Sequence, residues 1–346
     1  IFYEVYARTV RGNMETTDIP KNNSTKMRKF LTICGMMKKS KKERLLDMKL
    51  LSFTYNDQVR FGLKVKKEEA VWDVLAIQEQ LAVLPEFPQT MVEGVAKGLD
   101  FVEQIRKLVE AASNDENPAQ FKRAFTDITW LSPIPRTPKN IICVGRNYAD
   151  HAAEMGGVSP EDLIVFTKSP LTIAADEQTL PLHAHKTNSL DYEGELAIVI
   201  GKGGKNIPKN LAYDYVFGYS IANDISARDV QYRHEQFFLG KSLDGTCPIG
   251  PYVVTKDELP DPHALTIVTK VNDEIRQNAS TKNMLFQVDT LISTISTYVT
   301  LEPGDIILTG TPAGVGKGMN PPTYLKSGDV VKVSVEGIGT LVNRFE

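Results

Sequence analysis

Beyond residue 139 the chain is a succession of short apolar runs rich in valine and isoleucine, separated by glycine, proline and aspartate. The runs are NIICVG, ELAIVIG, VFGYSIAND, PYVVT, LTIVTKVND, DIILTG and VVKVSVEGIGTLVNRF. β-Branched residues between turn-forming residues are typical of strands. The pattern therefore predicts a strand-dominated unit, which is a barrel, a sandwich or a roll with a few helices.

A smaller unit precedes it. Residues 50–65, LLSFTYNDQVRFGLKV, form two strand-like runs around Asn56-Asp57, a pair typical of hairpin turns. Between residues 89 and 111 apolar side chains recur at helical spacing, which predicts an amphipathic helix broken near Gly94 or Gly98. We therefore expect an α+β fold with a small N-terminal α/β domain over residues 48–130 and a strand-dominated domain over residues 131–346.

Residues 1–47 differ in character from the rest. They carry eleven Lys/Arg against five Asp/Glu, a net charge of +6, and they show no sustained periodicity. A basic arm for nucleic acid or anionic lipid has this composition. We favour a disordered or non-native extension, because the patterned sequence begins at Met48.

Charge and cysteine content limit the class of protein. The formal net charge of the whole chain is only -3, so no overall field favours a nucleic acid or a membrane as partner. No apolar run approaches the roughly 18 residues of a membrane span, and no signal-peptide core stands near the start. The three cysteines are widely separated and form no CxxC pair, which favours a reducing, cytoplasmic location.

Three carboxylates mark a candidate metal site. Glu193 and Glu195 stand two residues apart just ahead of the run LAIVI, so a strand directs both side chains to one face. Asp224 ends the strand-like run VFGYSIAN. An all-oxygen set suits a hard divalent ion, with Mg²⁺ first, Mn²⁺ close behind and Ca²⁺ as a further candidate. Three carboxylates leave positions for water or substrate, which favours a catalytic site.

Several blocks, taken together, resemble the fumarylacetoacetate hydrolase family. They are ICVGRNYADHAAEMG, DYEGELAIVIG, NDISARDVQ, FFLGKSLDGTCPIGP and DIILTGTPAGVG, and they follow one another in the family's order across residues 139–346. The resemblance implies a mixed β-roll fold, a Mg²⁺ or Mn²⁺ ion held by Glu193, Glu195 and Asp224, and a homodimer. Within the family, the sequence resembles in particular the group of acylpyruvate hydrolases, oxaloacetate decarboxylases and 2-hydroxyhepta-2,4-diene-1,7-dioate isomerases.

The resemblance also assigns catalytic roles. His151 and Glu154 stand three residues apart, on one face of a helical turn, and spacing alone favours a solvent-facing pair. Hydrolytic members of the family carry their His-Glu pair at this position, so the resemblance makes His151 a general base that Glu154 orients. It makes Lys241 a group that stabilises a developing enolate.

Three further residues match substrate-binding positions of the family. Arg228 and Gln231 follow Asp224, and the Arg fork suits a carboxylate. Thr311 lies in the turn TGTPAG.

Two other patterns are set aside. GTPAGVGKG has the wrong spacing for a phosphate-binding loop, and Gly318 stands where Ser or Thr would be needed. His183 and His185 lack a third zinc ligand at suitable spacing. Cys143, in an apolar run, is expected to be a core residue rather than a nucleophile.

These features favour metal-dependent C–C bond cleavage of a small 2-oxo acid, by hydrolysis of an acylpyruvate or decarboxylation of oxaloacetate, through an enolate. The first alternative is an isomerase or tautomerase of a 2-hydroxy-diene dicarboxylate of the 5-carboxymethyl-2-hydroxymuconate or 2-hydroxyhepta-2,4-diene-1,7-dioate type. The second is a non-catalytic module that binds a metal or a ligand.

Overall fold

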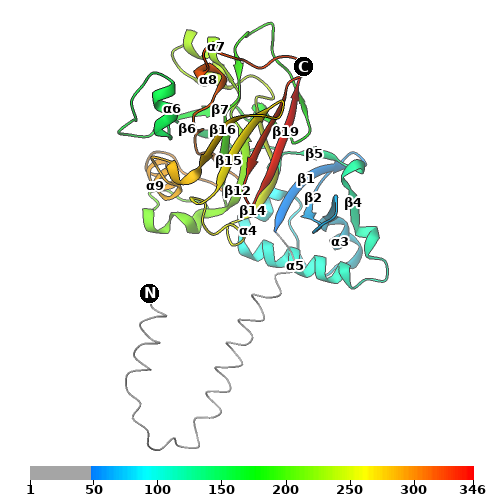
Figure 1. Ribbon diagram of the computed structural model, residues 1–346. Coiled ribbons are helices and arrows are strands. Elements are labelled where there is room, and N and C mark those ends of the chain that lie inside the picture. The colour runs from blue at the N-terminus through cyan, green and yellow to red at the C-terminus, as the bar shows by residue number, and fades with distance from the viewer. Residues whose placement is uncertain (1–47) are drawn as a thin grey trace, which may run out of the picture. The chain divides into compact units, whose positions relative to one another are not determined.

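The computed structural model describes residues 48–346, coloured from blue to red in Figure 1. The predicted basic extension, residues 1–47, lies outside the described residues. The described chain belongs to one compact unit. Among its helices, none combines the length and the apolar character that crossing a bilayer requires.

The first strands form the predicted hairpin. β1 (Lys49–Tyr55) pairs antiparallel with β2 (Gln58–Lys64), and the turn residues Asn56 and Asp57 have φ values of 49° and 60°. Positive φ at both positions is what a tight two-residue hairpin requires. β3 (Ala70–Asp73) and β4 (Lys122–Ala124) continue outward from β2, and β5 (Thr129–Leu131) pairs with β1.

Helices α3 (Val74–Leu81), α4 (Met91–Lys97) and α5 (Leu99–Ser113) accompany these strands. The predicted break lies at Gly98, whose φ of 60° ends α4 and begins α5. Gly94 has a different reason to be glycine, because a Cβ there would lie 2.3 Å from the ring of Phe101. The buried face of α5 consists of Phe101, Val102, Ile105, Leu108, Val109 and Ala112, at the helical spacing seen in the sequence.

The N-terminal strands and the later strands share one large sheet. Its order is β4-β3-β2-β1-β14-β12-β11-β17-β6-β7. The later members are β6 (Ile141–Gly145), β7 (Ile164–Lys168), β11 (Gly194–Ile200), β12 (Val216–Asn223), β14 (Cys247–Thr255) and β17 (Ile306–Leu308). β1 joins β14 in antiparallel pairing. Strand pairing thus crosses the predicted boundary near residue 130, and that boundary stays a prediction.

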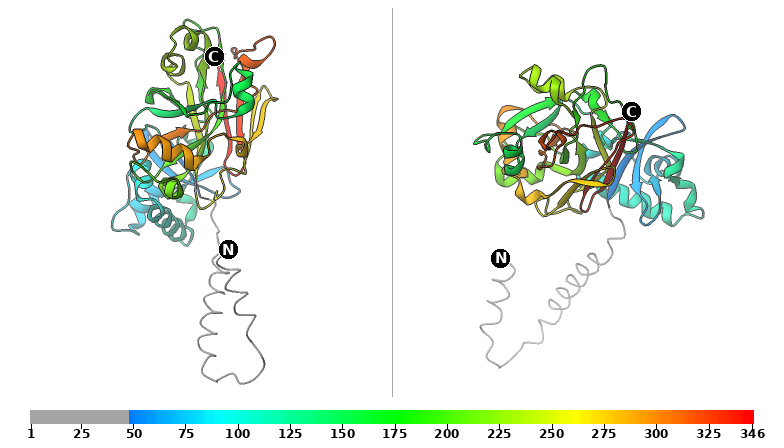
Figure 2. Two further views of the ribbon diagram at one scale, coloured as in Figure 1. Left: turned by 90° about the vertical axis from the view of Figure 1, so that its left-hand side faces the viewer. Right: turned by 45° about the horizontal axis from the view of Figure 1, so that its top comes forward.

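A second sheet faces the first. Its order is β16-β15-β18-β19-β9, where the strands are β9 (Thr179–Leu180), β15 (Thr266–Val271), β16 (Glu274–Ser280), β18 (Val330–Val335) and β19 (Gly339–Phe345). β11, β12 and β14 contact β15, β18 and β19, and Figure 2 shows these strands from two directions. Every residue of β11, β12 and β14 is buried, because the first sheet is covered on both faces there. In β18 buried residues alternate with partly exposed ones, which is the pattern of a strand covered on one face.

Short elements complete the fold. Two further strand fragments pair with each other, β10 (Leu190–Asp191) and β13 (Ser226–Ala227), and β8 (Ile173–Ala174) pairs with β14. The remaining helices are α6 (Ala149–Glu154), α7 (Arg228–Arg233), α8 (Phe238–Lys241) and α9 (Val288–Tyr298). The strand-dominated α+β fold predicted from the sequence is confirmed.

Candidate active site

Four neighbouring strands bring the predicted residues to one edge of the large sheet. β6 and β17 run parallel, whereas β11 is antiparallel to β17 and β12 is antiparallel to β11. The carboxyl ends of β6, β17 and β12 therefore meet the start of β11 at the same edge. Gly194 pairs with Asn223, so Glu193 and Asp224 lie across from each other at the ends of their strands.

The three predicted metal ligands converge there. Glu193, Glu195 and Asp224 each offer a carboxylate oxygen, and these oxygens lie within 4.8 Å of one another. All three side chains are buried, with exposures of 4%, 2% and 1%. The backbone fixes the arrangement, because the N–H of Asp224 donates to the carbonyl of Glu193 at 2.8 Å. Like charges so close and so dry require positive charge beside them.

That positive charge is unevenly shared. Burial opposes ionisation of Glu193, but Lys241 and Arg228 outweigh burial and lower its pKa to about 2. Burial raises the pKa of Glu195 well above its ordinary value, and the charges of Asp224 and Glu193 add to the rise. Among residues 48–346 no cation pairs with Glu195, which accepts the N–H of Gly310 at 2.6 Å. A hard divalent ion between the three carboxylates would balance the charge of Glu195, and the all-oxygen donor set suits such an ion.

Two buried lysines border the acidic set. Lys241, on α8, lies 2.6 Å from Glu193 Oε2 and 2.7 Å from Asp224 Oδ2 through its Nζ. Burial lowers the pKa of Lys241, but Asp224 and Glu193 outweigh burial and raise it above its ordinary value, so the side chain is an ammonium. Lys168, the last residue of β7, places its Nζ 2.8 Å from Asp224 Oδ1 and 2.9 Å from the carbonyl of Ile225.

Arg228 is held by two carboxylates. Its Nε lies 2.9 Å from Asp191 Oδ2, and its Nη2 lies 2.7 Å from Glu193 Oε1. Its Nη1 donates to Gln231 at 3.3 Å. Arg228 and Gln231 therefore lie at the site. The guanidinium of Arg228, however, already pairs with Asp191 and Glu193 instead of facing a substrate carboxylate unpaired.

His151 and Glu154 form the predicted pair. His151 Nδ1 lies 3.1 Å from Glu154 Oε2, and both residues belong to the short helix α6. The other carboxylate oxygen of Glu154 accepts the N–H of Gly314 at 2.9 Å. His151 is only 6% exposed and lines the same cavity as Glu193 and Glu195. The pair is therefore a fixed part of the site.

The glycine-rich turn at residues 310–318 binds carboxylates through its backbone. Besides the N–H groups of Gly310 and Gly314, those of Gly316 and Lys317 donate to Asp191 at 2.7 and 3.0 Å. Thr311 donates its hydroxyl to the carbonyl of Gly194 at 3.0 Å. This use of the amides agrees with setting aside a phosphate-binding loop. The backbone of this one turn thus binds Glu195 of the acidic set, Glu154 of the His-Glu pair and Asp191, the partner of Arg228.

A cavity of about 90 Å³ lies among these groups. Of the predicted site residues, His151, Glu193, Glu195, Arg228, Gln231, Lys241 and Thr311 line it. Asp224 and Glu154 do not line it, and they act on it through Lys241 and His151. Apolar side chains complete the wall, namely Val144, Met155, Phe166, Tyr232 and Phe237.

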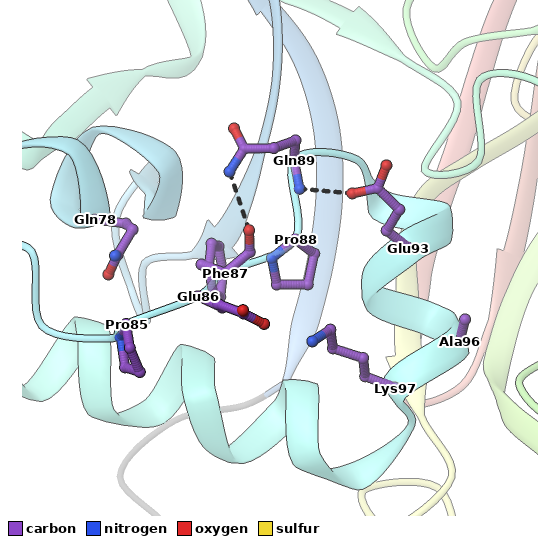
Figure 3. A pocket seen from close by; sticks show the side chains of 9 residues that line it. All are labelled: Gln78, Pro85, Glu86, Phe87, Pro88, Gln89, Glu93, Ala96 and Lys97. Atoms are coloured by element: carbon purple, nitrogen blue, oxygen red, sulfur yellow. Dashed lines mark hydrogen bonds between the residues drawn. The ribbon is translucent and has the colours of Figure 1, made fainter.

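A larger pocket, of about 720 Å³, lies elsewhere, beside α3 and α4 (Figure 3). Its polar groups include Glu93, which accepts the N–H of Gln89 at 2.8 Å, and Lys97. It contains neither a histidine nor a cysteine and no cluster of carboxylates able to hold an ion. Size therefore does not identify a reactive site, and the candidate catalytic residues His151 and Lys241 line the smaller cavity.

The histidines and the cysteine set aside in the sequence do not join the candidate site. His183 lies 2.8 Å from the carbonyl of Asp244 through its Nε2, and among the described residues the only candidate group of three metal ligands is the carboxylate set. Cys143 is buried in β6, and burial raises the pKa of its thiol well above the ordinary value, which disfavours a thiolate nucleophile.

Sequence reasoning missed three buried neighbours of the site. Asp191 stands two residues before Glu193, so the same alternation that singled out the two glutamates points to it. Lys168 gave no signal, because its partner Asp224 follows 56 residues later in the chain. Gln277, which donates to Thr311 at 2.7 Å and accepts the N–H of Gly194, comes from the second sheet.

Comparisons with known proteins place this fold and site in one family. The family model for the fumarylacetoacetate (FAA) hydrolase C-terminal region matches residues 140–346. The chain belongs to the fumarylacetoacetate hydrolase family, which includes enzymes of hydrolase and isomerase types. A protein of Staphylococcus epidermidis that bears no functional name is 52% identical over 296 residues, which cover 85% of this chain and 98% of that protein.

Three solved structures are similar. A fumarylacetoacetate hydrolase from psychrophilic Exiguobacterium antarcticum has a TM-score of 0.72 and 41% identity, over 86% of this chain and 99% of that one. A 2-hydroxyhepta-2,4-diene-1,7-dioate isomerase from Mycobacterium marinum has a TM-score of 0.62 and 29% identity, over 86% and 98%. A fumarylpyruvate hydrolase from Pseudomonas aeruginosa, in complex with Mn²⁺ and pyruvate, has a TM-score of 0.55 and 32% identity, over 60% and 89%. With the buried acidic set, the last of these supports a divalent metal here.

Proposed function

We propose that the protein is a divalent-metal-dependent enzyme that cleaves a C–C bond of a small 2-oxo acid, either by hydrolysing an acylpyruvate or by decarboxylating oxaloacetate. The observation that carries the proposal is that His151, held by Glu154, lines the same small cavity as Glu193, Glu195 and Lys241. A cavity with a hydrogen-bonded base beside a candidate metal site is arranged for acid–base chemistry.

The metal site is formed by Glu193, Glu195 and Asp224, with Mg²⁺ or Mn²⁺ as the ion. When bound, the ion supplies Lewis-acid stabilisation of negative charge on the substrate. The ammonium of Lys241, next to Glu193 and Asp224, adds a second positive charge at the same place.

In the hydrolytic reaction, His151 takes a proton from water while Glu154 holds the imidazole through Nδ1. The hydroxide attacks the carbonyl carbon remote from the 2-oxo acid group. The C–C bond then breaks, its electron pair forms the enolate of pyruvate, and a proton returned to carbon gives pyruvate and a carboxylic acid. Gln231 and Thr311 line the cavity beside the substrate. Of the two, the side-chain N–H groups of Gln231 are the donors to substrate oxygens, because the Thr311 hydroxyl already donates to Gly194. In decarboxylation the same enolate forms by loss of CO₂.

Steady-state release of pyruvate from acetylpyruvate and from oxaloacetate, with Mg²⁺ or Mn²⁺ present, tests the proposal. His151→Ala should lower acetylpyruvate turnover by about 10²–10⁴-fold, the usual contribution of a general base. Binding of oxalate, which resembles the enolate, should survive in the variant. The matched control is His185→Ala, because His185 is an exposed loop histidine outside the cavity.

The isomerase remains the second candidate, because a structure with that activity is similar over most of this chain. If metal-loaded protein binds oxalate but releases no pyruvate from either compound, cleavage is rejected. Conversion of a 2-hydroxy-diene dicarboxylate would then identify the isomerase. No turnover of any of these compounds would point to a non-catalytic binding module.

We also propose that the enzyme is a homodimer that acts in the cytoplasm and needs neither nucleic acid nor membrane. The family resemblance supports the dimer, and the unpatterned cysteines support the location. The mass in solution, measured by light scattering, should equal twice the chain mass of 38.5 kDa. A monomeric mass would contradict the dimer.

A further inference from the structure

Arg146 stands at the mouth of the cavity. It follows the last residue of β6 and lines the same cavity as His151 and Glu193. The metal-binding glutamates are buried to 4% and 2% exposure, whereas Arg146 is exposed. The carboxylates therefore lie on the buried side of the cavity, and Arg146 lies on its solvent-exposed side.

The backbone at Arg146 is held in an unfavourable conformation. Its φ is 55°, and among the residues lining this cavity it is the only non-glycine residue in the left-handed region. An arginine there costs free energy that a glycine would not. The next residue maintains the conformation, because the side chain of Asn147 donates to the carbonyls of Phe286 and Thr309 at 3.0 and 2.8 Å. Strain of this kind gathers where a side chain must be aimed.

The charge of Arg146 is uncommitted. Arg228 pairs with Asp191 and Glu193, and Lys241 pairs with Glu193 and Asp224. Within residues 48–346 the guanidinium of Arg146 makes neither a hydrogen bond nor an ion pair. It is therefore the cavity's cation that remains available to an anion from solution.

Gly157 makes room for this guanidinium. A Cβ on Gly157 would lie 2.8 Å from Arg146 Nη1 and 3.2 Å from its Cζ. Gly157 has no positive φ that would demand glycine, and a side chain at this position would have to displace the guanidinium. Two segments thus determine where the guanidinium of Arg146 lies, namely the end of β6 and the loop after α6.

We propose that Arg146 binds an anionic group at the end of the substrate that is remote from the metal-binding carboxylates. The preferred substrate is then a 2-oxo acid with a second carboxylate, since the planar fork of arginine matches a carboxylate through two parallel hydrogen bonds. Acetylpyruvate, which lacks that carboxylate, serves as a minimal substrate. This inference rests on the proposed function, because it takes the 2-oxo acid end to lie at the base of the cavity.

A non-reacting pair of ligands tests it without turnover. 2-Oxoglutarate and 2-oxopentanoate have the same chain length and differ only in a terminal carboxylate in place of a methyl group. Calorimetry on the Mn²⁺-loaded protein should show tighter binding of 2-oxoglutarate by about tenfold to hundredfold, the range for a hydrogen-bonded charge pair. Arg146→Met should remove this difference and leave the affinity for 2-oxopentanoate within about twofold.

Two variants make the test specific. Gly157→Ala keeps the charge but displaces the guanidinium, so it should reduce the preference for 2-oxoglutarate. Arg136→Met removes an exposed arginine outside the cavity and should leave the preference unchanged. Equal affinity for the two ligands in the wild type, or a preference that persists in Arg146→Met, would overturn the inference. Failure of the proposed function is a separate result, since it appears as absent pyruvate release while this binding preference remains.

Discussion

Gly318 lies so close to Glu154 that a side chain at this position has to move the carboxylate. A Cβ built on Gly318 lies 2.3 Å from Cγ, Cδ and Oε1 of Glu154. Gly318 has no positive φ, so alanine is compatible with its backbone. The clashing atoms are the end of a flexible side chain, and the cheapest response to Gly318→Ala is therefore a shift of Glu154 rather than loss of the fold.

The size of the effect follows from what Glu154 holds. Displacement breaks its hydrogen bond from the N–H of Gly314, at 2.9 Å, and disturbs its contact with His151. A hydrogen bond to a charged group contributes roughly 1.5–3 kcal/mol. At about 1.4 kcal/mol for each factor of ten in rate, kcat should fall about tenfold to hundredfold. The free energy of unfolding should fall by no more than the same amount, roughly 1.5–3 kcal/mol, because the lost hydrogen bond also stabilises the fold but no core packing is altered.

Steady-state kinetics on acetylpyruvate with Mn²⁺, together with urea unfolding, measures both quantities. Glu154→Ala and the double variant Gly318→Ala/Glu154→Ala complete a double-mutant cycle. The alanine at position 318 should have little effect once the glutamate is absent. An unchanged kcat in Gly318→Ala, or an equal loss of kcat with and without Glu154, would refute the role assigned to this contact.

Three further predictions concern charge. Lys168→Met should destabilise metal-free protein by roughly 1.5–3 kcal/mol in urea unfolding, because Asp224 Oδ1 loses its 2.8 Å partner while Lys241 still contacts Oδ2. Saturating Mn²⁺ should recover part of the loss, and an equal loss with and without Mn²⁺ would contradict this. Burial raises the pKa of Asp176 to about 7, so this group favours the native state below about pH 4 and loses that contribution as the pH rises to 7. Asp176→Asn should therefore gain stability relative to wild type between pH 4 and pH 8, by up to a few kcal/mol, and a pH-independent difference would reject the shift. Mn²⁺ at about 100 times its Kd should raise the unfolding free energy by about 2.7 kcal/mol over protein in EDTA, and the gain should vanish in Glu195→Gln.

Local patterns were sufficient to predict the acidic set. Alternation in a strand put Glu193 and Glu195 on one face, and the end of a strand-like run marked Asp224. The hairpin at Asn56-Asp57 and the helix break at Gly98 were also readable, since both depend on the conformational preferences of the residues concerned.

Long-range pairing was not readable. The pairing of β1 with β14 joins segments about 200 residues apart, and no local preference specifies it. Lys168 and Gln277 reach the site from β7 and β16, where nothing distinguishes them from the other polar residues of their strands. The engagement of Arg228 by Asp191 and Glu193 likewise depends on tertiary packing, because the chain pattern gives the Arg but not its partners.

The most direct test of the account is the dependence of cleavage on bound metal. Protein stripped with EDTA is titrated with Mn²⁺, and bound ion, from the loss of its free electron-spin signal, is compared with pyruvate release from acetylpyruvate in the same samples. The account predicts that the rate rises in proportion to bound Mn²⁺ up to one ion per chain, and that Glu195→Gln lowers both. Pyruvate release without bound Mn²⁺, or one bound ion per chain with no pyruvate release, would contradict it.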